Sequence, residues 1–365
     1  MFVSRVVAAA GAAALLSTSI VLPSGVAGAA DPGSGPRPTP ISARVASTPW
    51  SCAPVFFQSA ERSDDSSYQK LYEYSPTTNK FTGIGPNQPN IGTQVLGYNT
   101  ADNYLYELVN YRTTGDDTRM DLIRIDDSAT YSLVNAWSVP SQFNVGDFWN
   151  GSPSHSFVVG GDYTNSWRLV DVRNVNNSAT QASADFTITG SGSGAYFRGK
   201  DMTILGDTGY GLHDDTLYIL NLNTRTVSTK SVTFSGGGRG ASDGFGSAYA
   251  DALGNLYFFE NSTSQVWRLL AEDVKQSTPT LSKVGSGPAY VSGTVNVRLK
   301  APNDGASCPN ARSPYSATIS AEAATSVTDD TATLTATVNP NNISSTKARI
   351  CYGLSKQKSG GRLVG

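Results

Sequence analysis

The chain has 365 residues, a formal net charge of −2, 39% hydrophobic residues and only 15% charged residues. The hydrophobic content excludes a chain that is disordered throughout, and the lack of a positive surplus argues against a nucleic-acid partner. Abundant Gly (36) and Tyr (17) favour strands and turns over long helices, so we expect an all-β protein.

The first 30 residues have the organisation of a secretory signal peptide. Arg5 supplies a positive n-region, an apolar h-region follows, and "AGAA" at 27–30 offers small residues for cleavage. A retained membrane anchor is the alternative, but the apolar run is short for a membrane span. We therefore expect a secreted, extracellular or cell-surface protein with no integral membrane segment after cleavage. Residues 31–49 are rich in Pro, Gly and Ser and predict a solvated linker.

A short β-like segment recurs along residues 50–312. Its copies lie 51, 45, 50 and 49 residues apart and begin at Leu71, Leu122, Trp167, Leu217 and Val266. Each copy is followed by a second strand-like run, and four of them are preceded by an inner pair such as "VLGYNTADNYLYELV". Units of this size with four antiparallel strands indicate a β-propeller of about five blades, with six left open. A row of stacked sandwiches is the alternative, but each unit would be too small to bury its own core.

The first unit lacks one inner strand. Only "PVFFQSA" lies between Cys52 and Leu71, and we expect the missing strand to come from "VNVRLKAPNDGASC" at 295–308, so that both ends of the ring build one blade. Cys52 and Cys308 flank these two pieces and can oxidise in an exported chain. Such a disulfide would close a loop of about 257 residues and contribute roughly 4–5 kcal/mol. Two unpaired buried thiols are the alternative.

The same residues carry a resemblance to a known family. "GYNTADNYLY" from Gly97, "GDF" from Gly146 and "NDGASC" from Asn303 resemble motifs of a secreted actinobacterial β-propeller family of unknown function, over about residues 50–312. The resemblance implies a propeller and no established reaction or ligand.

Residues 313–365 carry a second resemblance. "ATSVTDDTATLTATVNPN" followed by "ARICYGLS" is similar to the opening of a fibronectin type III-like module. A whole module needs about 90–100 residues and seven strands, so we expect an incomplete sandwich.

No residue set declares a reaction. His155 and His213 both lie in turn-like sequences, and neither a zinc-hydrolase spacing nor a nucleophile elbow occurs. We therefore predict no catalytic residue, no metal site and no cofactor. The enzymatic alternative is a polysaccharide hydrolase or lyase that uses carboxylates in the central channel, which requires two carboxyls facing across a pocket.

Binding is the function that the predicted scaffold favours. The innermost strands of a propeller line a channel, and their loops form a face that binds ligands. Five residues in such positions are predicted to contact a ligand: Tyr98, Asp147, Trp149, Arg198 and Tyr249. Aromatic rings can stack on sugars or peptide side chains while Asp and Arg fix orientation, although packing between blades is the alternative role for each. We expect a non-catalytic scaffold for an extracellular polymer or protein ligand, with a structural spacer as a further alternative.

Overall fold

The computed structural model describes residues 48–62, 65–75, 80–89, 91–111, 119–138, 143–150, 156–172, 183–190, 196–237, 239, 244–285, 299–328 and 332–339. They form strands and turns with one short 3-10 helix, η2 (Asp273–Lys275), which confirms the all-β class. No helix in this part of the chain has the length and apolar character needed to cross a membrane. The predicted signal peptide (1–30) and nearly all of the predicted linker (31–49) lie outside the described residues.

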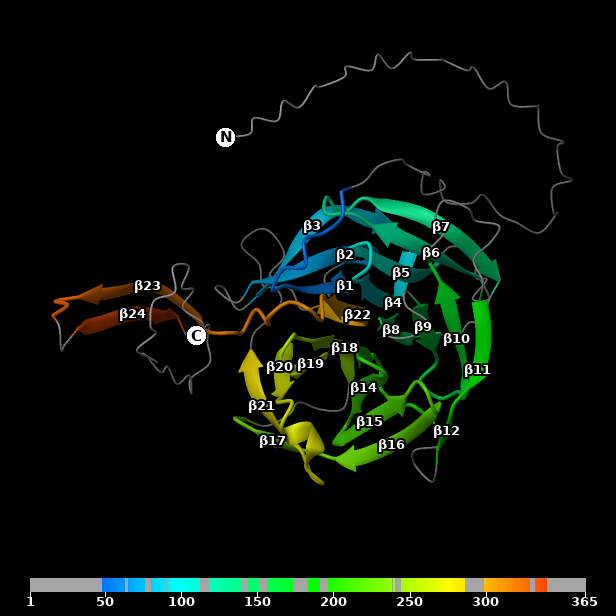
Figure 1. Cartoon of the computed structure of the whole chain (residues 1–365). Helices are drawn as coiled ribbons and strands as arrows, with labels where there is room; N and C mark the ends of the chain where they lie inside the picture. Colours follow the sequence, from blue (N-terminus) through cyan, green and yellow to red (C-terminus); the bar gives the residue numbers. More distant parts are fainter. Residues whose placement is uncertain are drawn as a thin grey trace, which may run out of the picture. The chain divides into compact units, whose positions relative to one another are not determined.

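Five antiparallel four-stranded sheets form the blades of a propeller ring, as predicted (Figure 1). From the innermost to the outermost strand, blade 1 contains β22 (Leu299–Ser307), β1 (Phe56–Arg62), β2 (Asp65–Ser75) and β3 (Lys80–Pro89). Blade 2 contains β4 (Ile91–Asn99), β5 (Tyr104–Tyr111), β6 (Arg119–Ile125) and β7 (Tyr131–Ser138). Blade 3 contains β8 (Val145–Trp149), β9 (Ser156–Gly160), β10 (Ser166–Asp171) and β11 (Ser183–Thr187).

The last two blades follow the same order. Blade 4 contains β13 (Thr203–Leu205), β14 (Thr208–His213), β15 (Thr216–Asn221) and β16 (Thr226–Ser231). Blade 5 contains β18 (Phe245–Ala250), β19 (Leu256–Glu260), β20 (Gln265–Leu269) and β21 (Thr280–Gly285). The recurring segments found in the sequence are therefore the third strands of the blades.

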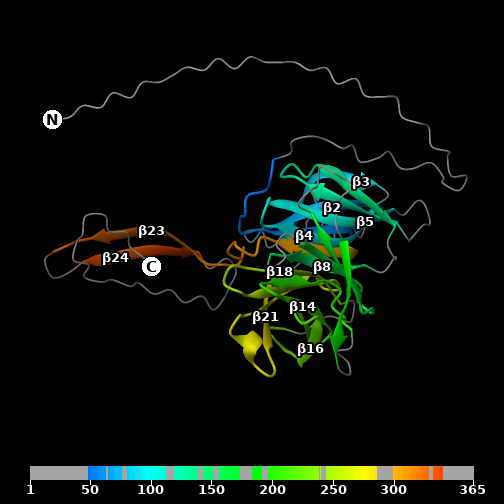
Figure 2. The same ribbon diagram turned by 45° about the vertical axis from the view of Figure 1, so that its right-hand side comes forward.

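The innermost strands close the ring. β22 contacts β4, and the contacts continue from β4 to β8, β13 and β18 and back to β22. Of these strands, β22, β4, β8 and β18 are labelled near the centre of the ring in Figure 1, and Figure 2 labels β4, β8 and β18 from a second direction. β22 also pairs antiparallel with β1, from Phe56 opposite Ser307 to Arg62 opposite Leu299, so both ends of the ring build blade 1 as predicted. The predicted disulfide between Cys52 and Cys308 is present, with Cα atoms 5.4 Å apart.

Hydrophobic clusters fill the boundaries between blades. The described residues form five such clusters, one at each boundary. Where blade 5 meets blade 1, the rings of Phe56 and Tyr249 stack with centroids 4.4 Å apart, and those of Tyr257 and Tyr315 lie 5.8 Å apart. A single blade is too small to bury a core alone, so each blade depends on its neighbours for burial.

A hydrogen-bonded turn explains why the inner hairpins repeat a sequence pattern. In the turn between β4 and β5, Asp102 accepts a hydrogen bond from the Tyr106 hydroxyl (2.6 Å). In the turn between β18 and β19, Asp251 accepts one from the Tyr257 hydroxyl (2.9 Å). Each turn also contains a residue with a left-handed backbone conformation, Asn103 (φ 58°) in one and Gly254 (φ 81°) in the other. Asn and Gly are the residue types that adopt this conformation most readily. "NTADNYLY" and "ADALGNLY" therefore share a turn aspartate that accepts from a tyrosine of the second strand, although the two loops differ in length by one residue.

Two outermost strands continue into the next blade. After β11, the short strand β12 (Thr189–Gly190) pairs in parallel with β16 of blade 4. After β16, β17 (Thr233–Ser235) pairs in parallel with β21 of blade 5. Blades 3, 4 and 5 are therefore joined at the rim by backbone hydrogen bonds as well as by their cores.

Residues 313–365 contain one antiparallel pair in their described part, β23 (Thr318–Thr325) and β24 (Thr333–Asn339). Almost every side chain of β24 is exposed, as expected for a two-stranded sheet without a packed face. The fibronectin type III-like interpretation stays a prediction, since residues 340–365 lie outside the described part.

We expect loss of the disulfide to destabilise the ring without changing its fold. The bridge joins positions 256 residues apart. Replacing both Cys52 and Cys308 by Ser frees this loop in the unfolded chain, so the free energy of unfolding should fall by about 2–5 kcal/mol. Urea denaturation with and without a reducing agent measures the effect. An unchanged midpoint in the double variant would contradict the prediction.

Candidate functional site

Two aspartates at the centre of the ring join innermost strands of different blades. Asp201, just before β13, accepts hydrogen bonds from the main-chain N–H groups of Ala248 on β18 (2.6 Å) and Gly305 on β22 (3.2 Å). Asp304 on β22 accepts one from the N–H of Leu96 on β4 (3.1 Å). Because each innermost strand is the edge of its sheet, these carboxyls satisfy amides that have no strand partner on that side.

Asp147 on β8 completes this set of links. Its carboxylate accepts hydrogen bonds from the N–H of Ile204 on β13 (2.8 Å) and from the N–H of Tyr98 on β4. The preceding Gly146 permits close packing, since a Cβ there would lie 2.2 Å from the carbonyl oxygen of Val158. In the "GD" pair, Gly146 therefore allows close packing and Asp147 links neighbouring strands. Together with the bonds of Asp201 and Asp304, this link joins all five innermost strands.

Burial raises the pKa values of these carboxyls. Burial is the main cause that raises the pKa values of Asp201 and Asp304 well above the usual range, and the negative charge of Asp201 raises the pKa of Asp304 further. Burial also raises the pKa of Asp147 to about 7, against the opposing effect of its hydrogen bonds. Glu107 on β5 is fully buried beside the Ser59 hydroxyl (2.5 Å), and its pKa is likewise raised to about 7.

This arrangement favours a structural role for the central carboxyls. Asp201 and Asp304 are each 1% exposed and accept hydrogen bonds from the main chain. A glycosidase pair would instead face a substrate pocket. Within the described ranges, no group of three His, Cys, Asp or Glu side chains is placed to hold a metal ion.

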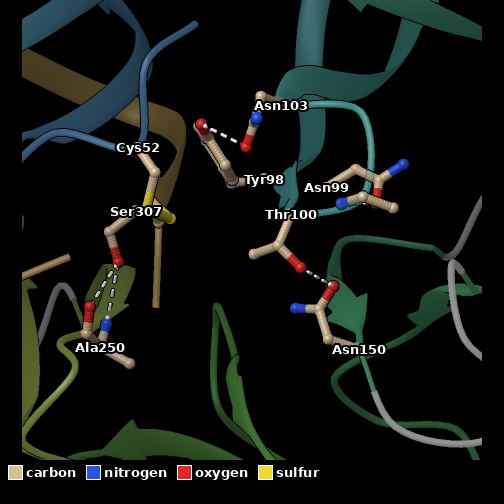
Figure 3. Close-up of a disulfide and its surroundings, with 10 residues drawn as sticks. Cys52, Tyr98, Asn99, Thr100, Asn103, Asn150, Ala250 and Ser307 are labelled. Atoms are coloured by element: carbon tan, nitrogen blue, oxygen red, sulfur yellow. Dashed lines mark hydrogen bonds between the residues drawn. A yellow bond between two sulfur atoms is a disulfide. The ribbon is translucent and has the colours of Figure 1, made fainter. Parts of the chain in front are cut away.

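Two of the predicted ligand-binding residues lie in the packing between strands. Tyr98 is 1% exposed and Tyr249 is fully buried. The Tyr98 hydroxyl donates to Oδ1 of Asn103 (3.2 Å), as Figure 3 shows, and the Tyr249 hydroxyl donates to Oε1 of Gln58 (3.2 Å). These positions match the alternative role, packing between blades.

The ends of the innermost strands are joined on the face that carries the disulfide (Figure 3). The Thr100 hydroxyl of blade 2 donates to Oδ1 of Asn150 in blade 3 (2.7 Å). The Ser307 hydroxyl of blade 1 donates to the Ala250 carbonyl of blade 5 (2.8 Å) and accepts from the Ala250 N–H (3.0 Å). These contacts hold the loops of this face in fixed positions.

Trp149, at the end of β8, lines a pocket of about 150 Å³ between blades 3 and 4. Its indole N–H donates to Oδ1 of Asp207 in the turn between β13 and β14 (2.9 Å). Of the five predicted residues, Trp149 is the one that the structure places in a pocket wall.

Arg198 belongs to a surface that we name the basic tyrosine patch: Tyr163, Arg198 and Lys200. Tyr163, in the turn between β9 and β10, is 56% exposed, and its ring centroid lies 5.6 Å from the Arg198 guanidinium and 5.2 Å from the Lys200 ammonium. Lys200 also pairs with Asp162, whereas no ion pair of Arg198 occurs among the described residues.

The backbone holds the two cations of the patch in place. In "FRGKD", Phe197 is buried against the ring of Trp167 (5.7 Å), and Asp201 is clamped at the centre. Arg198 and Lys200 alternate with these buried residues and are half-buried, as expected for alternating side chains of an extended segment. The cations are therefore presented by a fixed segment.

Sequence reasoning missed Tyr163, Lys200 and the pocket residues Asn223 and Arg225. The alternation in "FRGKD" was a usable signal for Lys200. Tyr163 and Arg225 carry no such signal, because their neighbours come from a different blade.

We expect the contribution of Glu107 to the stability of the protein to fall as pH rises from about 4.5 to about 7. A buried acid whose folded pKa lies above its unfolded pKa binds more protons in the folded state, so stability is lost between those two values. For Glu107, a rise from 4.5 to about 7 corresponds to about 3 kcal/mol. Glu107→Gln removes one titrating group, so the slope of the free energy of unfolding against pH should become shallower by the equivalent of about one proton. The free energy of unfolding measured at each pH gives this slope. The exposed control Glu272→Gln should keep the wild-type slope, and a wild-type slope in Glu107→Gln would refute the assignment.

Comparisons with solved structures give only distant likenesses. The periplasmic gluconolactonase PpgL of Pseudomonas aeruginosa is 14% identical, with 66% of this chain and 70% of that chain covered and a TM-score of 0.35. A functionally unknown protein of Desulfotomaculum acetoxidans is 14% identical (67% and 75% covered, TM-score 0.34), and the glutaminyl cyclase of Myxococcus xanthus is 11% identical (53% and 71%, TM-score 0.35). At these TM-scores the likenesses carry no argument about function.

No curated protein matches the chain. Residues 56–310, which span the ring from β1 to the end of β22, match the family described as "Repeat of unknown function (DUF6923)". The chain therefore belongs to this DUF6923 family of repeats of unknown function.

Proposed function

We propose that the protein is a secreted, non-catalytic scaffold that binds an acidic extracellular polymer through the basic tyrosine patch. The observation that carries the proposal is the exposed ring of Tyr163, which lies within 6 Å of two cations on a fixed segment.

The chemistry of the patch fits a polysaccharide that contains uronic acids. A tyrosine ring stacks on the apolar face of a pyranose ring, while Arg and Lys bind carboxylates through charge-assisted hydrogen bonds. Arg198 is the stronger candidate for the carboxylate, because Lys200 already pairs with Asp162. A uronic acid unit carries both groups, a pyranose face and a carboxylate, and a polymer of such units offers the patch many equivalent binding positions.

Export is supported by two features. The first 30 residues have the pattern of a signal peptide. The disulfide between Cys52 and Cys308 requires an oxidising compartment to persist.

The alternatives differ in what they require of the structure. A hydrolase or lyase needs carboxyls that face a substrate, and the central carboxyls instead accept hydrogen bonds from neighbouring strands. A spacer needs no ligand at all, so a binding measurement separates it from the proposed scaffold.

We expect polygalacturonate to retard the protein in affinity electrophoresis and neutral dextran to leave its mobility unchanged. Tyr163→Ala should weaken retardation by about 3–10-fold through lost stacking, and Arg198→Gln by a similar factor through the lost charge. Added NaCl should weaken wild-type binding because the charged groups are partly exposed.

Leu253→Ala is a matched control, because Leu253 is 64% exposed in the turn between β18 and β19, away from the patch. This variant should bind like the wild-type protein. Equal retardation by dextran and polygalacturonate, or full binding by both patch variants, would refute the proposed site. Absence of binding in the wild-type protein would favour the spacer.

A further inference from the structure

The pocket between blades 3 and 4 has the composition of a small ligand site. Its walls are aromatic and aliphatic, and its polar groups lie on one turn; the lining residues are Trp149, Leu169, Phe186, Leu222, Asn223 and Arg225. Trp149, Phe186 and Leu222 are at most 7% exposed, whereas Asn223 and Arg225 are exposed. An apolar floor with a few polar groups at the rim is typical of pockets that bind small organic molecules.

Arg225 supplies an available positive charge at the rim of this pocket. Its guanidinium lies 5.3 Å from the ring centroid of Phe186, and no carboxylate of the described residues forms an ion pair with it. Three other basic residues do have acidic partners: Arg168 pairs with Asp185, Lys200 with Asp162 and Arg239 with Asp214.

The carboxylate of Asp207, near the same rim, is engaged elsewhere. Its Oδ1 accepts the indole N–H of Trp149 (2.9 Å), and its Oδ2 accepts the side-chain N–H of Asn223 (2.8 Å). These two bonds fix the indole wall and the polar rim and leave the guanidinium of Arg225 for an external anion.

The turn that carries Arg225 places it in an unusual backbone conformation. Arg225 has φ 58°, in the left-handed region that favours Gly or Asn, so an Arg at this position is locally unfavourable. Its carbonyl accepts the N–H of Thr189 on β12 (2.9 Å), which holds the turn against the neighbouring blade. The side chain is therefore kept at the pocket rim at a cost in backbone strain.

We propose that this pocket binds a small planar carboxylate, with its ring between Trp149 and Phe186 and its carboxylate on Arg225. The volume of about 150 Å³ limits the ligand to roughly one six-membered ring with a short substituent. An aromatic carboxylate satisfies both parts of the site, because its ring fills the apolar floor and its two oxygens match the fork of a guanidinium.

Benzoate and its neutral isostere benzamide test the proposal on the full chain by isothermal titration calorimetry. For a ligand of this size we expect a Kd of about 0.1–1 mM for benzoate and at least tenfold weaker binding of benzamide. Arg225→Asn removes the charge while Asn tolerates the left-handed conformation, so it should bind benzoate at least tenfold more weakly and keep the wild-type Tm. Arg225→Lys keeps a charge without the fork and should bind with intermediate affinity.

Arg312→Gln is the matched control, since it removes an exposed arginine that follows β22 and does not line the pocket, so this variant should bind benzoate like the wild-type protein. Equal affinity for benzoate and benzamide, no benzoate binding by the wild-type protein at 10-fold above the expected Kd, or wild-type affinity in Arg225→Asn would each overturn the proposal. If Arg225→Asn does not fold, two comparisons still test the proposal: the affinities of the wild-type protein for benzoate and benzamide, and the affinity of Arg225→Lys for benzoate. This site shares no residue with the basic tyrosine patch, so polygalacturonate and benzoate binding succeed or fail independently.

Discussion

The ring depends on hydrogen bonds that carboxyls at its centre accept from main-chain amides of its innermost strands. The innermost strand of every blade is a sheet edge, and an amide that is buried there without an acceptor destabilises the fold. Asp147, Asp201 and Asp304 supply acceptors that belong to neighbouring blades, so each carboxyl satisfies the edge and fixes the angle between blades. The blade boundaries, with their aromatic clusters and the surface sites above them, are positioned by this centre.

The carboxyls at the centre of the ring cannot all carry a negative charge. Three aspartates and the nearby Glu107 could not all be ionised in a buried space without strong repulsion. Burial and the repulsion between neighbouring carboxylates raise the pKa values of Asp201 and Asp304 and so favour the protonated forms, while hydrogen bonds from main-chain N–H groups oppose this rise. The centre therefore resembles a hydrogen-bonded network more than a set of ion pairs, and its strength is tied to protonation.

The fold could be predicted because its signals are local. The regular spacing of the third strands along the sequence predicted the number of blades. The short first unit, together with Cys52 and Cys308, predicted how the ring closes. The sites could not be predicted to the same extent. Every residue of β18 and of β19 is buried, so the usual alternation that separates inward from outward side chains is missing, and Tyr249 could be read either way. Tyr163 and Arg198 are far apart in the sequence, and the packing of Phe197 against Trp167 and the ion pair of Lys200 with Asp162 bring them together.

The late position of β22 in the chain also constrains how the protein matures. β1 is synthesised early and β22 is the last strand of the ring to be synthesised. The edge of β1 and the amide of Leu96 therefore have no partner on β22 until nearly the whole ring has left the ribosome. An array of independent repeats can gain its final structure one unit at a time, but this ring cannot. Its last step joins strand, carboxyl and disulfide at one location, and a nascent chain that stops before residue 299 keeps an open sheet edge prone to aggregation.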